Sequence, residues 1–472
     1  VDVYRFVTHY RVRITRTALG SSMQGNRTST FASLASFASF AKAAAIVATG
    51  LLVSGHSMGQ LGAMMNPGLV GRDQTEAIRI NDAIFQATGF GNTTMVATPA
   101  GNVIVDTSLI VNAARHKRLL QAEDDGPVKY IILTHAHGDH IGGVNAWREE
   151  DTEIIAQDEH YEFVNYQNRL KGLFSQRNAA QFPSLNVVQL SELEIAEGVD
   201  NFGAEIVPTI MFEEEYNFEL GGVEFNVLHT PGETYDHLSV WVPKYRAAFV
   251  GDNFYTSFPN MYTLRGTKPR WALDYVDSIN RILALEPEIL IPSHGDAIIG
   301  EQQIQRELTR YRDAILYVHD KTVLGMNQGK DVHTLMAEIS LPSDLDIGEG
   351  YGRISWSVRG IYESYMGWFD GNPTSMFSTP VDEAYPQLVE LAGGAEAVAM
   401  LAEAQIESGD FELALHSADI ALSAEPQSVR ALQARLAAFN ALLAASDNSN
   451  EIGWLSFGVR ESQAALDAAL VP

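Results

Sequence analysis

Three histidines and an aspartate stand within six residues of each other in the run THAHGDHIGG, which begins at Thr134. Imidazole nitrogens and carboxylate oxygens are ligands for zinc and related divalent cations. The apolar run VKYIILT, which ends at Thr134, is typical of a buried strand, so these side chains follow a strand end and can converge on one pocket. We expect His135 and His137 to face one metal ion. Asp139 and His140, at the start of the following helix, are expected to face a second.

The composition limits which other ligands and reactions are available. The 472-residue chain has no cysteine, which excludes thiolate ligands, cysteine nucleophiles and disulfides. Any metal must therefore be bound by His, Asp and Glu. The chain carries 32 Lys and Arg against 59 Asp and Glu, a net charge of −27, and such a chain repels phosphate backbones. We therefore expect no nucleic-acid partner.

Short β-rich segments and a few helices surround the histidine run between about residue 84 and residue 300. The run VATPAGNVIVDT predicts a hairpin with its turn at residues 99–102. Further strands are predicted for GVEFNVLHT, HLSVWVP, RAAFVGD and EILIPSH. Strands with interspersed helices indicate an α/β core. The run ALDYVDSINRILALEP predicts an amphipathic helix with this apolar face: Leu273, Val276, Ile279, Ile282 and Leu283.

After Glu301 the pattern becomes almost entirely helical. QQIQRELTRYRDAILYVHDKTVLGMNQG predicts one long helical tract and SWSVRGIYESYMGWFDGNP a second. The tail that begins at Ala395 alternates helix, Gly-Asp turn, helix, Glu-Pro turn and helix. This spacing resembles tetratricopeptide-type hairpins, and a plain helical bundle accounts for it equally well.

The N-terminal region has the layout of an export signal. Two basic residues after Met23 precede the apolar stretch 43–53, which small residues follow. This layout predicts a secretory signal peptide at residues 23–57, with an Ala-rich helix or a transit peptide as the alternatives. Residues 1–22 are then a candidate over-extended start. We expect an exported bacterial protein, periplasmic or secreted, without a membrane span, because no apolar run approaches the ~20 residues that a span requires.

The histidine run resembles the H-x-H-x-D-H signature of the metallo-β-lactamase superfamily, and the other motifs of that superfamily occur in the expected order. Asp106, which ends the strand NVIVD, stands where the superfamily keeps a carboxylate that orients the metal loop. The runs HTPGET, GD and PSHG contribute Glu233, Asp252 and His294, although Glu233 replaces the usual histidine. The resemblance implies an α/β fold, the αββα sandwich of this superfamily.

The resemblance also implies a ligand set for two metal ions: His135, His137 and Glu233 for the first ion, Asp139, His140 and His294 for the second, and Asp252 as the bridge. Nitrogen and carboxylate ligands without sulfur suit two Zn²⁺ ions per chain, and Mn²⁺ or iron fit the same ligand types. Zinc lowers the pKa of a bound water to about 7, so the implied nucleophile is a metal-bound hydroxide. We expect His229 to be structural, and His237 to lie behind the ligands or to face the substrate.

The glutamate at position 233 and several later segments extend the resemblance to the bacterial zinc alkylsulfatases. Their N-L-Y-T-L-R-G segment is similar to NMYTLRG here, which contains Tyr262 and Arg265. The runs YRDAILYVHD and GWFDGNP resemble the alkylsulfatase dimerisation domain. We therefore expect a metallo-β-lactamase catalytic domain at residues 58–305. A helical dimerisation domain with a tetratricopeptide-like tail is expected at residues 306–472.

This resemblance implies zinc-dependent hydrolysis of sulfate monoesters. With two zinc ions, three carboxylates and a hydroxide, the centre is formally neutral, so a local cation must hold the anionic ester. Arg265 is suited to this because its planar guanidinium can donate to two oxygens at once, and Tyr262 is expected to lend a hydroxyl. Asp252 departs from the family, which usually has glutamate there. No stretch resembles the sterol-carrier-like domain of the long alkylsulfatases, which disfavours long-chain detergent substrates.

Two other functions are consistent with the same sequence. The metal centre could act on a carboxyl-derived bond, as in a lactonase, a β-lactamase-like enzyme or another ester hydrolase. The second possible function is a helical interaction protein whose metal site has lost its activity. The intact set of predicted ligands argues against this function. We expect a homodimer through the helical region, because its aromatic residues suit a buried interface, although they also suit an intrachain core. These residues are Trp356, Tyr362, Tyr365, Trp368 and Phe369.

Overall fold

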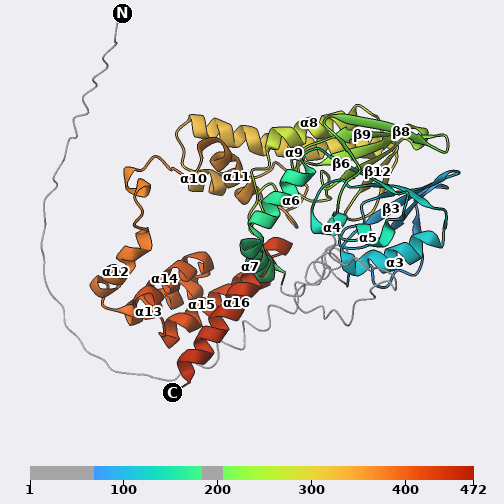
Figure 1. The fold of residues 1–472 in the computed structure, drawn as a ribbon. Helices are drawn as coiled ribbons and strands as arrows, with labels where there is room; N and C mark the ends of the chain where they lie inside the picture. Colours follow the sequence, from blue (N-terminus) through green and yellow to red (C-terminus); the bar gives the residue numbers. More distant parts are fainter. Residues whose placement is uncertain (1–68, 183–205, 472) are drawn as a thin grey trace, which may run out of the picture. The chain divides into compact units, whose positions relative to one another are not determined.

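Two β-sheets form the first part of the structure (Figure 1). The computed structural model describes residues 69–182 and 206–471, so the candidate start at residues 1–22 and the predicted signal peptide at residues 23–57 lie outside the described residues. The first sheet, in spatial order, contains β1 (Ile78–Arg79), β2 (Ile84–Ala87), β3 (Thr93–Thr98), β4 (Gly101–Val105), β5 (Val128–Ile132), β6 (Glu153–Gln157) and β7 (Ile210–Phe212). The second contains β13 (Ile298–Ile299), β12 (Ile289–Pro292), β11 (Ala247–Gly251), β10 (Leu238–Val242), β9 (Val223–His229) and β8 (Glu215–Leu220).

The two sheets pack face to face through apolar side chains. Val103 and Ile132 of the first sheet belong to the same buried cluster as Phe225 and Val240 of the second. Successive residues of a strand point to opposite faces of the sheet, so the apolar residues that alternate along each strand fill this shared layer. This layer is the centre of the sandwich and holds the strand ends in fixed positions.

Strand direction explains why the candidate ligands can meet. β4 and β5 are parallel, so the loops that follow them leave the first sheet at the same edge. In the second sheet β11 is parallel to β12, and β9 runs in the same direction because both β9 and β11 are antiparallel to β10. The segments that directly follow these five strands, including the short helix α4, contain all the predicted ligands and Asp106. The topology therefore places residues from distant parts of the chain at two neighbouring sheet edges.

Helices cover the outer face of each sheet. On the first sheet, Leu120 packs in a buried cluster with Ile104. On the second, Tyr275 packs with Leu290. These layers confirm the predicted αββα sandwich (Figure 1). The helices of this part are α3 (Ile110–Gln121), α4 (Gly138–Ile141), α5 (Val144–Trp147), α6 (His160–Arg169), α7 (Lys171–Gln181), α8 (Ala272–Leu283) and α9 (Glu301–Asn327), with the short 3₁₀ helix η4 (Pro243–Tyr245).

The helix α8 is placed as predicted, but one residue of its predicted apolar face is wrong. Val276 and the three later members of that face are buried, whereas Leu273 is 42% exposed. Ala272 and Tyr275 take its place in the core. An α-helix has 3.6 residues per turn, so the face that packs on the second sheet is defined by Ala272, Tyr275 and Ile279. Leu273 lies at the edge of that face.

The remainder of the described chain is helical, as predicted. The helix α9 continues without interruption through the predicted domain boundary between residues 305 and 306. Helices α13, α14, α15 and α16 pack as consecutive antiparallel neighbours, with turns at the predicted Gly-Asp and Glu-Pro positions. The elements are α10 (Val332–Glu338), α11 (Ile354–Met366), η5 (Pro373–Met376), η6 (Val381–Ala384), α12 (Tyr385–Leu391), α13 (Ala395–Ser408), α14 (Phe411–Ala424), α15 (Val429–Ala445) and α16 (Ser449–Leu470). Among the described helices, none has both the length and the apolar character needed to cross a bilayer.

Candidate metal centre

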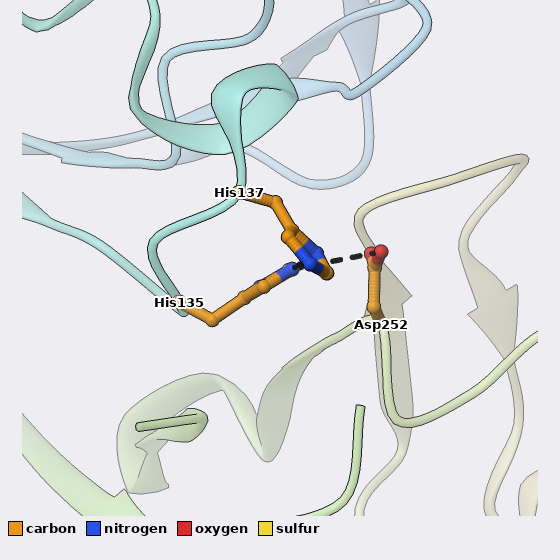
Figure 2. A group of neighbouring side chains, drawn as sticks. All are labelled: His135, His137 and Asp252. Atoms are coloured by element: carbon orange, nitrogen blue, oxygen red, sulfur yellow. Dashed lines mark hydrogen bonds and ion pairs between the residues drawn. The ribbon is translucent and has the colours of Figure 1, made fainter. Parts of the chain in front are cut away.

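The loop between β5 and α4 brings two imidazole rings together. The Nε2 atom of His135 lies 2.8 Å from the Nδ1 atom of His137. The carboxylate of Asp252, which follows β11 in the other sheet, approaches the same point, with 3.8 Å between its Oδ2 atom and His135 Nε2 (Figure 2). These three side chains offer ligand atoms within 4.8 Å of one another. They form a first candidate metal group.

A second group lies on the other side of the Asp252 carboxylate. Its members are Asp139 and His140 of α4 and His294 after β12, again with ligand atoms within 4.8 Å of one another. The Nε2 atoms of His140 and His294 lie 3.5 and 3.4 Å from Asp139 Oδ2, and each is 3.3 Å from Asp252 Oδ2. Asp252 therefore faces both groups, as a bridging carboxylate would.

The chemistry of this donor set fits divalent cations. The buried atoms His140 Nε2 and Asp252 Oδ1 have no hydrogen-bond partner among the described residues, which is unusual for buried polar atoms. Burial and the neighbouring imidazoles hold the pKa of His135 well below its usual value. The carboxylates of Asp252 and Asp139 instead raise the pKa of His140 and bring that of His294 to about 10, so a metal ion displaces protons from these two rings. Neutral imidazole is the form that binds a metal. Two neighbouring groups of three donors, with the Asp252 carboxylate of the first facing the second as well, are suited to hold a pair of ions.

Glu233 lies beside the first group but is also bound from behind. Its Oε1 atom is 3.9 Å from His137 Nδ1. Its Oε2 atom accepts hydrogen bonds from the Arg270 guanidinium and, at 2.9 Å, from the Tyr275 hydroxyl. Its backbone N–H donates to Asn253 Oδ1 at 2.9 Å. One oxygen of Glu233 thus faces the metal centre, and the other is fixed by Arg270 and Tyr275. These two buried partners were not predicted from the sequence.

Asp106 connects the loops that carry the candidate ligands. This buried carboxylate accepts hydrogen bonds from the backbone N–H and the hydroxyl of Thr134, both at 2.8 Å. It also lies 2.8 Å from His140 Nδ1 and accepts from the Ser293 hydroxyl at 2.7 Å. The contact with His140 leaves Nε2 of that ring to face the centre. The geometry is the one expected of a carboxylate that orients metal ligands.

The variant Asp106→Asn should bind metal more weakly. An amide in place of the carboxylate supplies one acceptor oxygen where several donors now converge, so His140 loses its fixed orientation. We expect the dissociation constant for zinc, measured by competition with a chelator, to rise about 10- to 100-fold. The exposed Asp382 on η6 provides the matched control, Asp382→Asn. Equal zinc affinity in both variants would show that Asp106 is not an orienting residue.

The structure places His237 behind the candidate ligands, which is one of the two alternatives left open for it. The side chain is fully buried, its Nε2 atom accepts the backbone N–H of Asp252 at 3.1 Å, and its ring stacks on His135 at 5.3 Å. His237 therefore lies behind the ligands and fixes the bridging residue. Gly251 makes this approach feasible, since it has a φ of +53° and a Cβ there would lie 2.3 Å from His237 Nε2. His229 lies outside both metal groups, 2.9 Å from the Tyr235 carbonyl oxygen.

The two predicted substrate residues are placed differently. Arg265 is partly exposed in a tight turn that the Gly266 N–H to Thr263 carbonyl hydrogen bond closes at 2.9 Å. Burial is the largest cause that lowers the pKa of His137, and the positive charge of Arg265 is the second largest. The Arg265 guanidinium therefore lies near the first metal group. Within residues 69–182 and 206–471, no hydrogen bond or ion pair engages this guanidinium. The Tyr262 ring packs against Gly360 of α11, and no described hydrogen bond joins its hydroxyl to the ligands.

Two further polar residues of the same segment were not identified from the sequence. Asn260 and Thr263 are fully buried, yet the Asn260 amide and the Thr263 hydroxyl have no hydrogen-bond partner among the described residues. The Asn260 carbonyl accepts from Arg270 at 2.7 Å, which links this segment to the guanidinium that holds Glu233. Both residues belong to the NMYTLRG run, so the signal that pointed to Arg265 could also have pointed to them.

Comparison with known proteins associates this chain with two family descriptions. Residues 87–294 match the metallo-beta-lactamase superfamily, and residues 332–463 match alkyl sulfatase dimerisation. A linear primary-alkylsulfatase of a Pseudomonas strain is 30% identical over 395 residues, which cover 79% of this chain and 74% of that protein. An alkyl/aryl-sulfatase of Saccharomyces cerevisiae is 28% identical, and an (R)-specific secondary-alkylsulfatase of Pseudomonas is 27% identical. The chain spans 58% and 57% of the lengths of these two relatives.

Solved structures also resemble this fold. The stereoselective inverting sec-alkylsulfatase from Pseudomonas superimposes with a TM-score of 0.73 at 23% identity. The superposition covers 84% of this chain and 66% of the Pseudomonas chain. The shared fold therefore includes both the sandwich and a large part of the helical region.

Proposed function

Because the chain belongs to the alkylsulfatase family of the metallo-β-lactamase superfamily, whose relatives named above are sulfate-ester hydrolases, we propose that it hydrolyses sulfate monoesters at a dizinc centre. The observation that carries this proposal is the pairing of two convergent metal groups with Arg265, a nearby guanidinium that no described residue engages. A metal pair activates water, and a guanidinium that none of the described residues engages can select an anionic substrate.

The metallo-β-lactamase fold implies bound metal, and the six residues of the two convergent groups, joined by Glu233, would hold it. We propose zinc, two ions per chain, because the donors are imidazoles and carboxylates. When bound, such ions supply Lewis acidity and lower the pKa of water. The protein itself fixes the donors: Asp106 orients His140, His237 holds the Asp252 backbone, and Arg270 holds Glu233.

The sulfate group is proposed to lie between the metal centre and the turn that carries Arg265. A guanidinium can donate two hydrogen bonds to one sulfate. Tyr262 remains a predicted contributor.

Sulfate release separates this proposal from the lactonase alternative. The zinc-loaded chain is incubated in parallel with a short linear alkyl sulfate, a lactone and a β-lactam, and inorganic sulfate or ring opening is followed. We expect kcat/KM for the sulfate ester to exceed kcat/KM for the lactone and for the β-lactam. Efficient ring opening without sulfate release would replace the proposed function by the lactonase or β-lactamase-like alternative.

We also propose that the chain forms a homodimer through its helical region, supported by the match to the alkyl sulfatase dimerisation family. Trp368, Tyr365 and Phe369 are 75%, 50% and 39% exposed, whereas Trp356 and Tyr362 are partly buried, the latter against the core of the chain. Large exposed aromatic side chains in one segment are typical of an interaction surface. The predicted aromatic group therefore divides into core and surface members.

The variant Trp368→Asp should weaken this dimer. A charge at the most exposed aromatic residue of the segment would be buried without a partner in the interface, which is unfavourable. Light scattering across micromolar concentrations should give the mass of two chains for the unmodified protein and of one for the variant. Val207→Asp is a matched control, because Val207 is also exposed but lies outside the helical region. The mass of one chain for the unmodified protein would overturn the dimer.

Export is proposed on the sequence of residues 23–57 alone. The basic start, the apolar stretch and the small residues that follow it support a cleaved signal peptide. N-terminal sequencing of protein from a bacterial periplasmic fraction should begin near residue 56. Recovery of the chain in the cytoplasm with its N-terminal residues intact would contradict the proposal.

A further inference from the structure

We propose that Asp236 and helix α6 position the two histidines of the first metal group by holding the backbone between them. Ala136 stands between His135 and His137 in the loop after β5, and the two imidazoles approach each other (Figure 2). The peptides on either side of Ala136 therefore set the directions of both rings. This inference rests on the proposed metal-dependent function and deepens it, since it assigns residues that orient the first group.

Side chains engage both polar groups of the Ala136 backbone. Its N–H, which belongs to the peptide bond with His135, donates to Asp236 Oδ2 at 3.0 Å. Its carbonyl oxygen, which belongs to the peptide bond with His137, accepts from the side-chain amide of Gln167 at 3.3 Å. Ala136 is buried, so these backbone groups depend on the protein for their partners. Each hydrogen bond thus fixes the peptide that leads to one of the two histidines.

Asp236 acts on the centre through this backbone and not as a donor. It stands three residues after Glu233, its side chain is fully buried, and it belongs to neither group of three convergent donors. Burial raises the pKa of Asp236 to about 6, so near pH 7 the side chain is mainly ionised and its oxygens accept hydrogen bonds. A buried carboxylate is costly unless it is hydrogen-bonded, and the Ala136 N–H offsets part of that cost.

One face of α6 packs against the same loop. His160, Phe163 and Gln167 are three and four residues apart, so they lie on one side of the helix. His160 Nδ1 is 3.8 Å from Asp236 Oδ2, and the Phe163 ring meets the His137 ring edge-on with 5.3 Å between the centroids. This helix face therefore contacts the carboxylate, the loop backbone and one of the candidate ligands.

The contacts of Asp236 and α6 reach the first group alone. Within residues 69–182 and 206–471, no hydrogen bond, ion pair or ring contact joins Asp236 or α6 to the second group, which consists of Asp139, His140 and His294. Partners that orient metal ligands typically change metal affinity by about 10- to 100-fold. Loss of the Asp236 acceptor should therefore weaken the first group and spare the second.

The test follows each metal group separately by cadmium NMR on the full chain, without a substrate. The cadmium chemical shift depends on the donor atoms, so the unmodified chain should give one resonance for each group. His294→Ala removes a donor of the second group and identifies its resonance. Asp236→Leu should shift or broaden the other resonance and raise the cadmium Kd of the first group about 10- to 100-fold. Asp236→Asn keeps an acceptor oxygen for the Ala136 N–H and should restore most of the affinity.

Gln167→Leu tests the second contact without a change of charge. It removes the donor to the Ala136 carbonyl at a half-buried helix position, and the cadmium Kd of the first group should rise about two- to tenfold. Asp124→Leu is a matched control, because Asp124 accepts the Gly126 backbone N–H at 2.9 Å just before β5. Gln176→Leu, at an exposed position of α7, is the other. Both controls should leave both resonances unchanged.

An unchanged first resonance in Asp236→Leu, or equal changes in both resonances, would overturn the proposal. Asp236→Asn as damaging as Asp236→Leu would also overturn it, since the carboxylate would then act by its charge and not as an acceptor. Circular dichroism checks the fold, and Gln167→Leu decides the question if Asp236→Leu does not fold. If the first group responds as expected but no sulfate ester is hydrolysed, the positioning assignment holds and the proposed activity fails.

Discussion

Asp252→Ala should abolish hydrolysis of sulfate esters and remove most of the bound metal. The Asp252 carboxylate lies 3.3 Å from the Nε2 atoms of both His140 and His294 and 3.8 Å from that of His135. Its loss removes the one donor that faces both metal groups and leaves the imidazoles of His135, His140 and His294 facing one another. We expect kcat/KM to fall by at least about 10³-fold, equivalent to about 4 kcal/mol of transition-state stabilisation.

The metal content of Asp252→Ala, measured by elemental analysis, should fall from two ions per chain to one or fewer. Its far-ultraviolet circular dichroism should be unchanged, because Asp252 lies in the loop after β11 and the sandwich core does not depend on it. Asp277→Ala, at an exposed position of α8, controls for the loss of a carboxylate elsewhere. Two ions and full activity in Asp252→Ala would contradict the dinuclear assignment.

Arg265→Ala should impair hydrolysis of sulfate esters far more than that of neutral substrates. The Arg265 guanidinium lies close enough to lower the pKa of His137, and no described residue engages it. On a chain with a net charge of −27, long-range attraction does not bring an anion to the centre, so a local cation must. Hydrogen bonds to charged groups contribute ~1.5–3 kcal/mol each, so losing two of them should lower kcat/KM by about 10²- to 10⁴-fold.

The discriminating measurement is the ratio of two activities in the same variant. Any side activity of Arg265→Ala on a neutral ester or lactone should fall by less than about tenfold, because that substrate carries no charge for the guanidinium to bind. Arg359→Ala, at an exposed arginine paired with Glu363 on α11, should leave both activities unchanged. Equal loss on both substrates in Arg265→Ala would mean that this residue is structural.

The sequence predicted those site residues that stand close together in the chain or directly after a strand. The run from His135 to His140 follows a buried strand directly, so its ligand spacing could be interpreted without the rest of the fold. Asp252 and His294 also stand just after predicted strands, and parallel strand order brings these loops to one edge. Apolar periodicity, which is equally local, predicted individual strands and helices, whereas the layers of the sandwich were implied by the resemblance to the metallo-β-lactamase superfamily.

Residues that act through tertiary packing were not predictable in this way. Arg270 and Tyr275 contact Glu233 across 37 and 42 residues of sequence, and neither stands in a pattern that indicates this contact. The position of the Tyr262 ring against Gly360 likewise depends on how α11 packs. Leu273 was predicted to be buried but lies at the edge of the buried face of α8, because periodicity indicates the width of an apolar face more securely than its centre.

The central claim, that two metal ions held by this donor set hydrolyse sulfate esters, is tested most directly by zinc titration of metal-free protein. Inorganic sulfate released from a short alkyl sulfate is measured at each addition of zinc. We predict no release without metal and a rise that ends at two equivalents per chain. Release that is complete at one equivalent, that needs no metal, or that is absent at two equivalents would contradict the account.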